Sequence, residues 1–296
     1  MLKLILNYLE CSRIYISVHC YFFYFIALAV SVQQTGKVDY FLSLLCFGIT
    51  FFNHNIAYLI NSLIDFLYEV DTDLTVDKTL FGLTSIIVLK RYMWFSTISI
   101  GLLLIPVYTN YNFDIFKIVL YFTIIQYIGS VIYTPAKYVA CGQFFFFGFH
   151  VSTLSFFYFS QCKEIVIFDM GHPITLFNFL IMLSMLQVIQ GNYHRDHDDD
   201  KRAGIITIAI LLGKKLSLYY FYSLFIMYCI WVIYISFYLN NFYYLLMLLI
   251  FKKMHNLYLG AKKGDVFMLN WRVCKIYYLS YPFLVLAIIL GGKITI

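Results

Sequence analysis

The sequence predicts an all-α fold, a polytopic membrane bundle of about nine transmembrane helices. Hydrophobic residues make up 62% of the 296 residues and charged residues only 12%, and the mean hydropathy is +0.81. These values lie far outside the usage of soluble domains. Apolar runs recur along the chain at about the 17–25 residues needed to cross hydrocarbon. The runs do not alternate between polar and apolar residues, which excludes a transmembrane β-barrel and leaves helices.

The predicted spans follow one another along almost the whole chain. The region 216–252 can be divided in more than one way, so eight or ten spans are the alternatives. Lys3 and Arg13 flank the first apolar run, and no convincing cleavage site follows Val32. We therefore expect an uncleaved first span and not a signal peptide. The nine predicted spans are 14–32, 40–61, 92–109, 115–134, 142–160, 173–193, 216–237, 239–252 and 276–292.

The positive charges predict an orientation for these spans. With the amino terminus inside, all but four of the 21 Lys and Arg residues fall in inner segments, as the positive-inside rule requires. The loops after the second, fourth, sixth and eighth spans are then all cytoplasmic. This distribution explains the net charge of +6, so we expect a lipid bilayer around the chain and no nucleic-acid partner. The four exceptions are Lys37, Lys117, Lys163 and Lys293.

Acidic residues gather in two of these inner loops. Nine of the fifteen Asp and Glu residues lie there, although inner loops are usually basic. Packing like charges together costs energy unless a cation lies among them, and a hard divalent metal is the natural candidate. Two merely solvated loops are the alternative. The nine are Asp65, Glu69, Asp71, Asp73, Asp77, Asp196, Asp198, Asp199 and Asp200.

The two acidic groups share one spacing. Asn61, Asp65 and Glu69 stand four residues apart, and they share a stripe if the second span continues as a helix beyond the membrane. The same steps recur after the sixth span, at Asn192, Asp196 and Asp200. Two stripes that face each other present about six oxygen ligands, which suits Mg²⁺ shared between carboxylates and a diphosphate. We therefore predict Mg²⁺ as the cofactor.

At these two groups the chain resembles the UbiA superfamily of membrane prenyltransferases. That superfamily carries N-D-x-x-D-x-x-x-D after its second helix and D-x-x-x-D after its sixth, within nine helices around a central cavity. Here the first motif reads N-S-L-I-D-F-L-Y-E-V-D-T-D from Asn61, and the second reads N-Y-H-R-D-H-D-D-D-K-R-A-G from Asn192. The resemblance covers most of the chain and implies one integral membrane domain over residues 1–296.

Within the superfamily the motifs are most similar to those of the 1,4-dihydroxy-2-naphthoate polyprenyltransferases of menaquinone synthesis. Their first motif runs on to D-T, as at Asp71 and Thr72, and their second is matched closely from Asn192 to Gly213. This implies Mg²⁺-dependent transfer of a prenyl group from an isoprenyl diphosphate to an aromatic acceptor, with release of pyrophosphate. Three departures leave the acceptor open: Ser62 replaces the usual Asp, Ile205 the usual Lys and Ile208 the usual Leu.

The metal ligands are expected among the two matched stripes. Asp65 and Asp196 would be the central ligands and thus catalytic. The full predicted set is Asn61, Asp65, Asp196 and Asp200, followed by Glu69 and Asn192.

Basic residues near the motifs are the candidates for binding the diphosphate. Lys78 is the first choice because it follows the first motif in D-K-T-L-F-G, where the family usually places a basic residue. Tyr133 and Lys137, in Y-T-P-A-K, resemble the Y-x-x-P segment of the family, and Arg195 and Arg13 come next. Lys78 and Tyr133 are the two of these expected to act in catalysis. Each basic residue could instead be an anchor at the inner membrane surface.

Other polar residues inside the spans carry weaker signals. His54 lies in the middle of the second span, where polar groups usually face the bundle interior. We expect it to bond to a neighbouring helix or to line the substrate cavity. The seven cysteines are scattered, without a C-x-x-C pair or a Cys/His spacing typical of zinc sites, and are interpreted as small core residues.

Two other functions compete with aromatic prenyl transfer. A terpene cyclase of the same superfamily would keep the metal motifs but close the prenyl cation on its own chain, without an acceptor. A transporter or channel would need acidic residues at the membrane midplane, whereas here they stand at the ends of spans.

Overall fold

The structure, a computed structural model, describes residues 2–72 and 78–291, and only the backbone of residues 15–17. Asp73 and Asp77 of the first acidic group lie outside the described residues, as does residue 292 at the end of the ninth predicted span. Within the described part the chain is helical, and its only β feature is an isolated bridge between Val139 and Ile206. The predicted all-α class is therefore confirmed.

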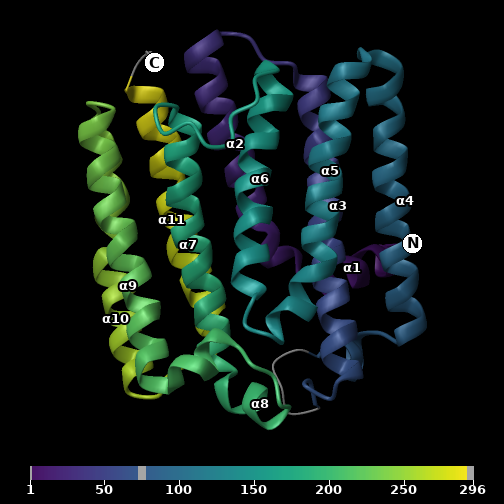
Figure 1. Ribbon diagram of the computed structural model, residues 1–296, viewed down its shortest axis with the longest axis vertical. Helices are drawn as coiled ribbons and strands as arrows, with labels where there is room; N and C mark the ends of the chain where they lie inside the picture. Colours follow the sequence, from purple (N-terminus) through teal and green to yellow (C-terminus); the bar gives the residue numbers. More distant parts are fainter. Residues whose placement is uncertain (1, 73–77, 292–296) are drawn as a thin grey trace.

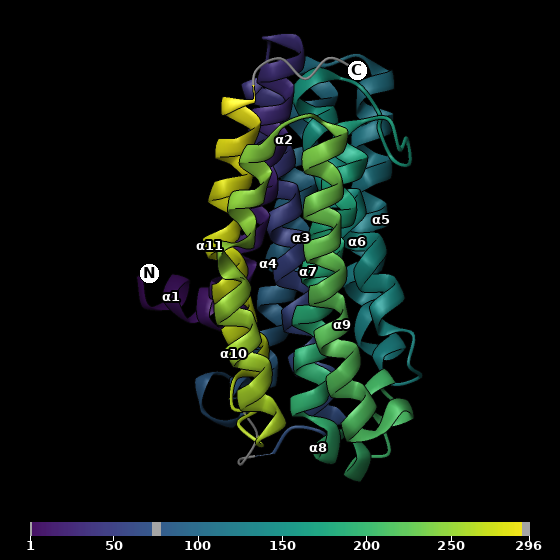
Figure 2. The same cartoon turned by 90° about the vertical axis from the view of Figure 1, so that its left-hand side faces the viewer.

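The helices run mostly side by side along the long axis of the molecule (Figure 1). The first helix, α1, lies across the others near their middle (Figure 2). In chain order the elements are α1 (Leu2–Cys11), α2 (Ile14–Thr35), α3 (Tyr40–Leu67), the π-helical turn η1 (Thr79–Leu83), α4 (Ile86–Asn110), α5 (Phe113–Lys137), α6 (Gly142–Cys162), α7 (Pro173–Arg195), α8 (His197–Arg202), α9 (Ile208–Tyr238), the 3₁₀ helix η2 (Phe242–Ile250), α10 (Phe251–Lys262) and α11 (Leu269–Leu290).

Six helices of the described residues are long and apolar enough to cross a membrane, namely α3, α4, α5, α7, α9 and α11. They occupy six of the nine predicted spans. The predicted first and fifth spans correspond to α2 and α6, and the eighth to η2 with α10, all of which pack within the same bundle. The multi-pass architecture is thus confirmed, whereas the count of nine membrane-crossing helices is not.

The predicted boundaries of the eighth span, 239–252, were wrong. The helical segment begins at Phe242 and continues through α10 to Lys262. Asn240 has a left-handed backbone (φ +47°), and the Asn241 side chain caps the new helix by accepting a hydrogen bond from Tyr243 N at 3.1 Å. Lys252 and Lys253 suggested that a loop begins there. Exposed Lys side chains are, however, also compatible with the outer face of a helix.

Buried polar side chains tie the helices together inside the bundle. Gln126 on α5 accepts a hydrogen bond from Thr50 of α3 at 3.2 Å and donates one to Thr153 of α6 at 3.4 Å. His54 of α3 lies 3.0 Å from His19 of α2, Nε2 to Nε2. Such contacts satisfy polar groups that lipid cannot solvate. The expectation that His54 contacts a neighbouring helix is confirmed.

The loops that carry the sequence motifs meet at one end of the bundle. The connections after α3, α5, α7 and α10 all lie at the lower end in Figure 1, together with α8. The loops after alternate predicted spans therefore share one end of the bundle. The most deeply buried of the six apolar helices is α7, which packs against α6, α9 and α11 and therefore holds its carboxyl-terminal motif at the centre of that end.

Candidate active site

A polar cavity of about 400 Å³ opens at this end of the bundle, among α3, α5, α7, α8 and the start of α11. Charged and amide side chains dominate its lining. Ten of the eleven predicted site residues line it: Arg13, Asn61, Asp65, Lys78, Tyr133, Lys137, Asn192, Arg195, Asp196 and Asp200. Segments more than 100 residues apart in the chain are therefore brought to one cavity.

Glu69 is the predicted site residue that does not line this cavity. The expectation that the second span continues as a helix through this residue was wrong, because α3 ends at Leu67. Glu69 has a left-handed backbone (φ +57°) and an exposed side chain. The turn brings Asp71 to the cavity instead, so the first stripe consists of Asn61 and Asp65 and is followed by Asp71.

Asp65 is a buried carboxylate with three side-chain donors. Asn61 Nδ2 donates to it at 2.7 Å, the Tyr138 hydroxyl at 2.6 Å and Lys137 Nζ at 3.2 Å. Both members of the Lys137–Asp65 ion pair are less than a tenth exposed. Removal of either one would therefore leave an uncompensated buried charge. Burial, and next the negative charge of Asp65, raise the pKa of Tyr138 above its ordinary value, so the phenol stays protonated and donates its hydrogen.

The second stripe keeps the predicted helical register. Asp196 N bonds to Asn192 O at 3.0 Å and Asp200 N to Asp196 O at 2.8 Å, so the i, i+4 pattern continues from α7 into α8. Arg195 forms a bidentate pair with Asp196 at 2.6 and 2.7 Å. Arg195 also donates to Asn192 Oδ1 at 2.9 Å and to Asn270 Oδ1 at 2.8 Å. The guanidinium group is thereby fixed between α7 and α11.

Asp200 is the least satisfied acid of the cavity. It is 1% exposed, and its buried Oδ2 has no hydrogen-bond partner among the described residues. Burial raises its pKa to about 7, opposed by the positive charge of Lys137 and assisted by the negative charges of Asp196 and Asp65. A buried acceptor without a donor is costly, and a cation bound there would satisfy it. The donor set therefore fits a hard divalent metal.

Sequence reasoning missed some residues of this site. Asn270, which holds Arg195, comes from the first turn of α11, and Tyr138, which holds Asp65, follows α5. Glu10 and Trp271 also line the cavity. These residues lie outside both motifs, and their only signal is a polar or aromatic side chain at the end of a predicted span.

An apolar cavity of about 80 Å³ adjoins the polar one deeper in the bundle. Aromatic and aliphatic side chains such as Tyr58, Phe146, Phe149 and Val188 line it. The two cavities share wall residues and are therefore adjacent, so a ligand with a polar head and an apolar tail could use both. The shared residues are Arg13, Asn61, Tyr133, Asn192 and Asn270.

The sequence pattern of the UbiA prenyltransferase family matches residues 21–258. The chain belongs to this family. Among curated proteins, this UbiA-family chain is 27% identical to "UbiA prenyltransferase domain-containing protein 1" of Danio rerio over 204 residues, which is 66% of the chain and 58% of that protein. It is 36% identical to the protein of the same name from Rattus norvegicus over 111 residues, 36% of the chain and 31% of that protein. The chain thus spans less than two thirds of the length of these relatives.

Solved structures show the same fold. A digeranylgeranylglyceryl phosphate synthase matches with a TM-score of 0.58 and 22% identity over 98% of the UbiA-family chain and 99% of its own. A UbiA homologue from Archaeoglobus fulgidus, described as bound to DMAPP and Mg²⁺, matches with a TM-score of 0.56 and 17% identity over 96% and 99% of the two chains. At these identities the likeness establishes the fold alone.

Proposed function

We propose that the protein transfers a prenyl group from an isoprenyl diphosphate to an aromatic acceptor, in a Mg²⁺-dependent reaction that releases pyrophosphate. The observation that carries this proposal is the meeting of two Asn-Asp stripes, from α3 and from α7–α8, in one cavity with basic residues. The A. fulgidus homologue of the same fold is described as binding a prenyl diphosphate and Mg²⁺, which supports the proposal.

The carboxylate and amide oxygens of the two stripes would hold Mg²⁺. Asp65 and Asp200 are the buried acids of the set, and Asp196 is held in place by Arg195. When bound, Mg²⁺ neutralises the charge that develops on the leaving diphosphate. The five proposed ligands are Asn61, Asp65, Asn192, Asp196 and Asp200.

Basic side chains would bind the diphosphate around this acidic centre. Lys78 is exposed and lines the polar cavity, and Arg13 lines both cavities. Lys137 is paired with Asp65 and Arg195 with Asp196, so each is positioned within the charged centre. Cationic donors fixed in this way stabilise negative charge as the carbon–oxygen bond of the prenyl diphosphate breaks.

The apolar cavity would receive the prenyl chain. Its aromatic rings, including Tyr58, Phe146 and Phe149, can stabilise an allylic cation through their π faces and keep water away from it. Tyr133 lines both cavities, so it lies at the boundary where the reactive carbon would stand. An aromatic carbon of the acceptor then attacks the cation and loses its proton.

We infer a dihydroxynaphthoate-type acceptor from the motifs. Asp71 belongs to the D-T extension of the first motif, and Arg195 to the second motif. Asp71 lines the polar cavity and Arg195 is fixed by four hydrogen bonds, so both residues contribute to the proposed site. We also propose that residues 1–296 act as a single domain and that the site faces the cytoplasm, since nearly all basic residues were assigned to the loops of that face.

Product analysis tests the proposed function. Detergent-purified protein would be incubated with Mg²⁺ and geranyl, farnesyl or geranylgeranyl diphosphate, with and without dihydroxynaphthoate or 4-hydroxybenzoate, followed by mass spectrometry. We expect pyrophosphate and a prenylated aromatic product only when an acceptor is present. Pyrophosphate together with a cyclic hydrocarbon in the absence of acceptor would instead identify a terpene cyclase, and no Mg²⁺-dependent turnover would refute both functions.

The metal affinity is expected to depend on pH through Asp200. Its pKa of about 7 lies above the ordinary value of 3.8, so the carboxyl binds a proton as the pH falls through 7. Metal must then displace that proton, and its apparent affinity should fall by up to about tenfold per pH unit below pH 7. Titration with Mn²⁺, followed by electron paramagnetic resonance, measures this slope.

The exposed neighbour Asp198 supplies the control for this pH dependence. Hydrogen bonds from Lys214 and next from His197 lower its pKa. Asp198→Asn should leave the slope below pH 7 unchanged, whereas Asp200→Asn should flatten it. A flat profile in the wild-type protein would show that Asp200 does not compete for protons and metal.

The two-pronged geometry of Arg195 should matter as much as its charge. Arg195→Lys keeps the charge but loses the bidentate contact with Asp196 and the bond to Asn270. We expect pyrophosphate release to fall by about tenfold or more, since misplacement of a positioning group is costly. The matched control is Arg202→Lys, whose exposed side chain pairs with Asp199 and should retain full activity. Equal activity of both variants would contradict this role.

A further inference from the structure

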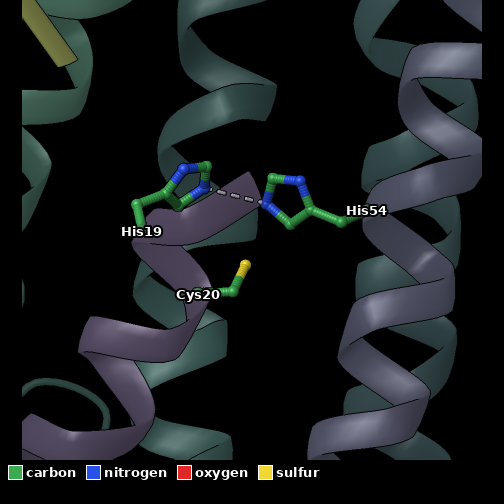
Figure 3. Close-up of side chains that lie close together, drawn as sticks. All are labelled: His19, Cys20 and His54. Atoms are coloured by element: carbon green, nitrogen blue, oxygen red, sulfur yellow. Dashed lines mark hydrogen bonds between the residues drawn. The ribbon is translucent and has the colours of Figure 1, made fainter. Parts of the chain in front are cut away.

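A second cluster of metal-ligating side chains lies within the helices, apart from the acidic residues. His19 and Cys20 belong to α2 and His54 to α3, and all three are buried. One ligand atom from each of the three lies within 4.8 Å of the others. Figure 3 shows the two imidazole rings facing each other and the sulfur of Cys20 pointing toward the gap between them.

The contact between the two imidazoles requires a proton or a cation. Their Nε2 atoms are 3.0 Å apart, too close for two facing lone pairs. A third imidazole adds to this demand, because His150 Nε2 lies 3.2 Å from the same His19 nitrogen. His150 Nδ1 is 2.9 Å from the carbonyl of Phe146 and must donate to it, so in the neutral ring its Nε2 carries a lone pair. The lone pair of His150 Nε2 is thus directed at His19 Nε2, which must carry a proton or a cation to accept this contact.

We propose that His19, Cys20 and His54 bind a monovalent copper ion. Imidazole nitrogen and thiolate sulfur are ligands that Cu⁺ accepts well. Metal–nitrogen and metal–sulfur bonds of about 2.0 and 2.3 Å place trigonal ligand atoms about 3.5–3.7 Å apart. The two nitrogens are 3.0 Å apart and all three ligand atoms lie within 4.8 Å of one another, so small side-chain movements would complete the site.

The charge of the surroundings favours Cu⁺ over Zn²⁺. One thiolate and Cu⁺ give a neutral centre, whereas the same ligands leave Zn²⁺ with one uncompensated positive charge. The adjoining apolar cavity, which His19 and His54 line, is formed by apolar and neutral polar residues and by one charged residue, Arg13. A net positive centre beside a positive side chain in a poorly solvated interior is expensive. A neutral one avoids that cost.

Two of the three ligands lie beside the cavities of the candidate active site. His19 and His54 line the apolar cavity, which shares wall residues with the open polar cavity. The proposed site is therefore separated from the open polar cavity only by the walls of the apolar one. The sequence did not reveal it because the ligands come from two helices, 34 residues apart at the nearest pair, so no local Cys/His spacing arises.

Competition for copper tests the proposal. The full chain, purified under reducing and oxygen-free conditions, would be titrated with Cu⁺ alone against the chelator bathocuproine disulfonate. We expect one Cu⁺ per wild-type chain, with sulfur and nitrogen ligands visible by X-ray absorption. Cys20→Ser and His54→Gln should each weaken binding by at least about 100-fold, since even changes behind the ligands cost 10–100-fold.

Matched variants separate the site from general effects. Cys46→Ser removes a different buried cysteine, on α3, and His255→Gln removes a histidine of α10 that bonds to Tyr222 of α9. Both should bind copper as the wild type does. The unfolding temperature of copper-free Cys20→Ser should match that of the wild type, which shows that it folds. Wild-type affinity in Cys20→Ser, loss of all copper to the chelator, or tighter binding of Zn²⁺ through Cys20 would each overturn the proposal.

Discussion

Replacing Asp200 with Asn is expected to reduce catalysis strongly without weakening the fold. The buried Oδ2 of Asp200 has no hydrogen-bond partner among the described residues, and burial raises the pKa of its carboxyl group to about 7. Its negative charge therefore destabilises the metal-free protein. An amide removes that charge and leaves only a neutral, weaker oxygen donor in place of the carboxylate ligand. We expect pyrophosphate release to fall by about 10²–10³-fold, as when a preorganised electrostatic group is removed, while the unfolding temperature stays equal or rises.

Two measurements on one preparation check this prediction. Pyrophosphate release at saturating Mg²⁺ reports catalysis, and thermal unfolding in detergent without metal reports stability. Glu69→Gln is the matched control, because Glu69 holds the third position of the first stripe as Asp200 does of the second, but lies outside the cavity. It should keep both properties. An active Asp200→Asn variant, or one that unfolds at a much lower temperature, would refute the assigned role.

Removing the positive partner of Asp65 is expected to have the opposite effect on stability. Lys137 and Asp65 form an ion pair in which both side chains are less than a tenth exposed. In Lys137→Met the carboxylate would remain buried with two neutral donors among the described residues, Asn61 and Tyr138. Loss of one partner of a buried pair typically lowers the free energy of unfolding by about 3–5 kcal/mol. Chemical unfolding in mixed micelles measures the change.

The double variant identifies the cause of that loss. In Asp65→Asn/Lys137→Met both charges are gone, so most of the lost stability should return, although the protein stays inactive. Lys163→Met serves as the comparison, because Lys163 pairs with Asp39 in a partly exposed setting where ion pairs contribute little. If the double variant were no more stable than Lys137→Met, the effect would come from packing and not from the stranded charge.

The sequence predicted the second stripe better than the first, for a local reason. Asn192, Asp196 and Asp200 follow helical periodicity, and the backbone bonds that carry it continue through the junction of α7 and α8. The prediction for the first stripe was wrong at Glu69, because the helix has ended and this residue has a left-handed backbone in the following turn. That residue type has no strong preference for such a turn, so the end of α3 could not be read from the sequence.

Contacts between distant segments were beyond sequence reasoning. Asn270 holds Arg195 from 75 residues away, and neither residue type specifies the other. The pairing of Lys137 with Asp65 was likewise not predicted, although each had been assigned to the site by its motif. The boundaries of the eighth span failed because exposed lysines on a helix face resemble a loop when only hydropathy is read.

Binding of an unreactive substrate analogue tests the central claim most directly, namely that the two stripes jointly hold Mg²⁺ and a prenyl diphosphate. A thiolo-diphosphate analogue of geranyl diphosphate would be titrated into the protein with Mg²⁺ or with EDTA. We expect Mg²⁺ to tighten binding by at least about tenfold, and expect Asp65→Asn on α3 and Asp196→Asn after α7 each to remove this gain. Equal affinity in EDTA, or a Mg²⁺ effect that survives in either variant, would contradict a site shared between the stripes.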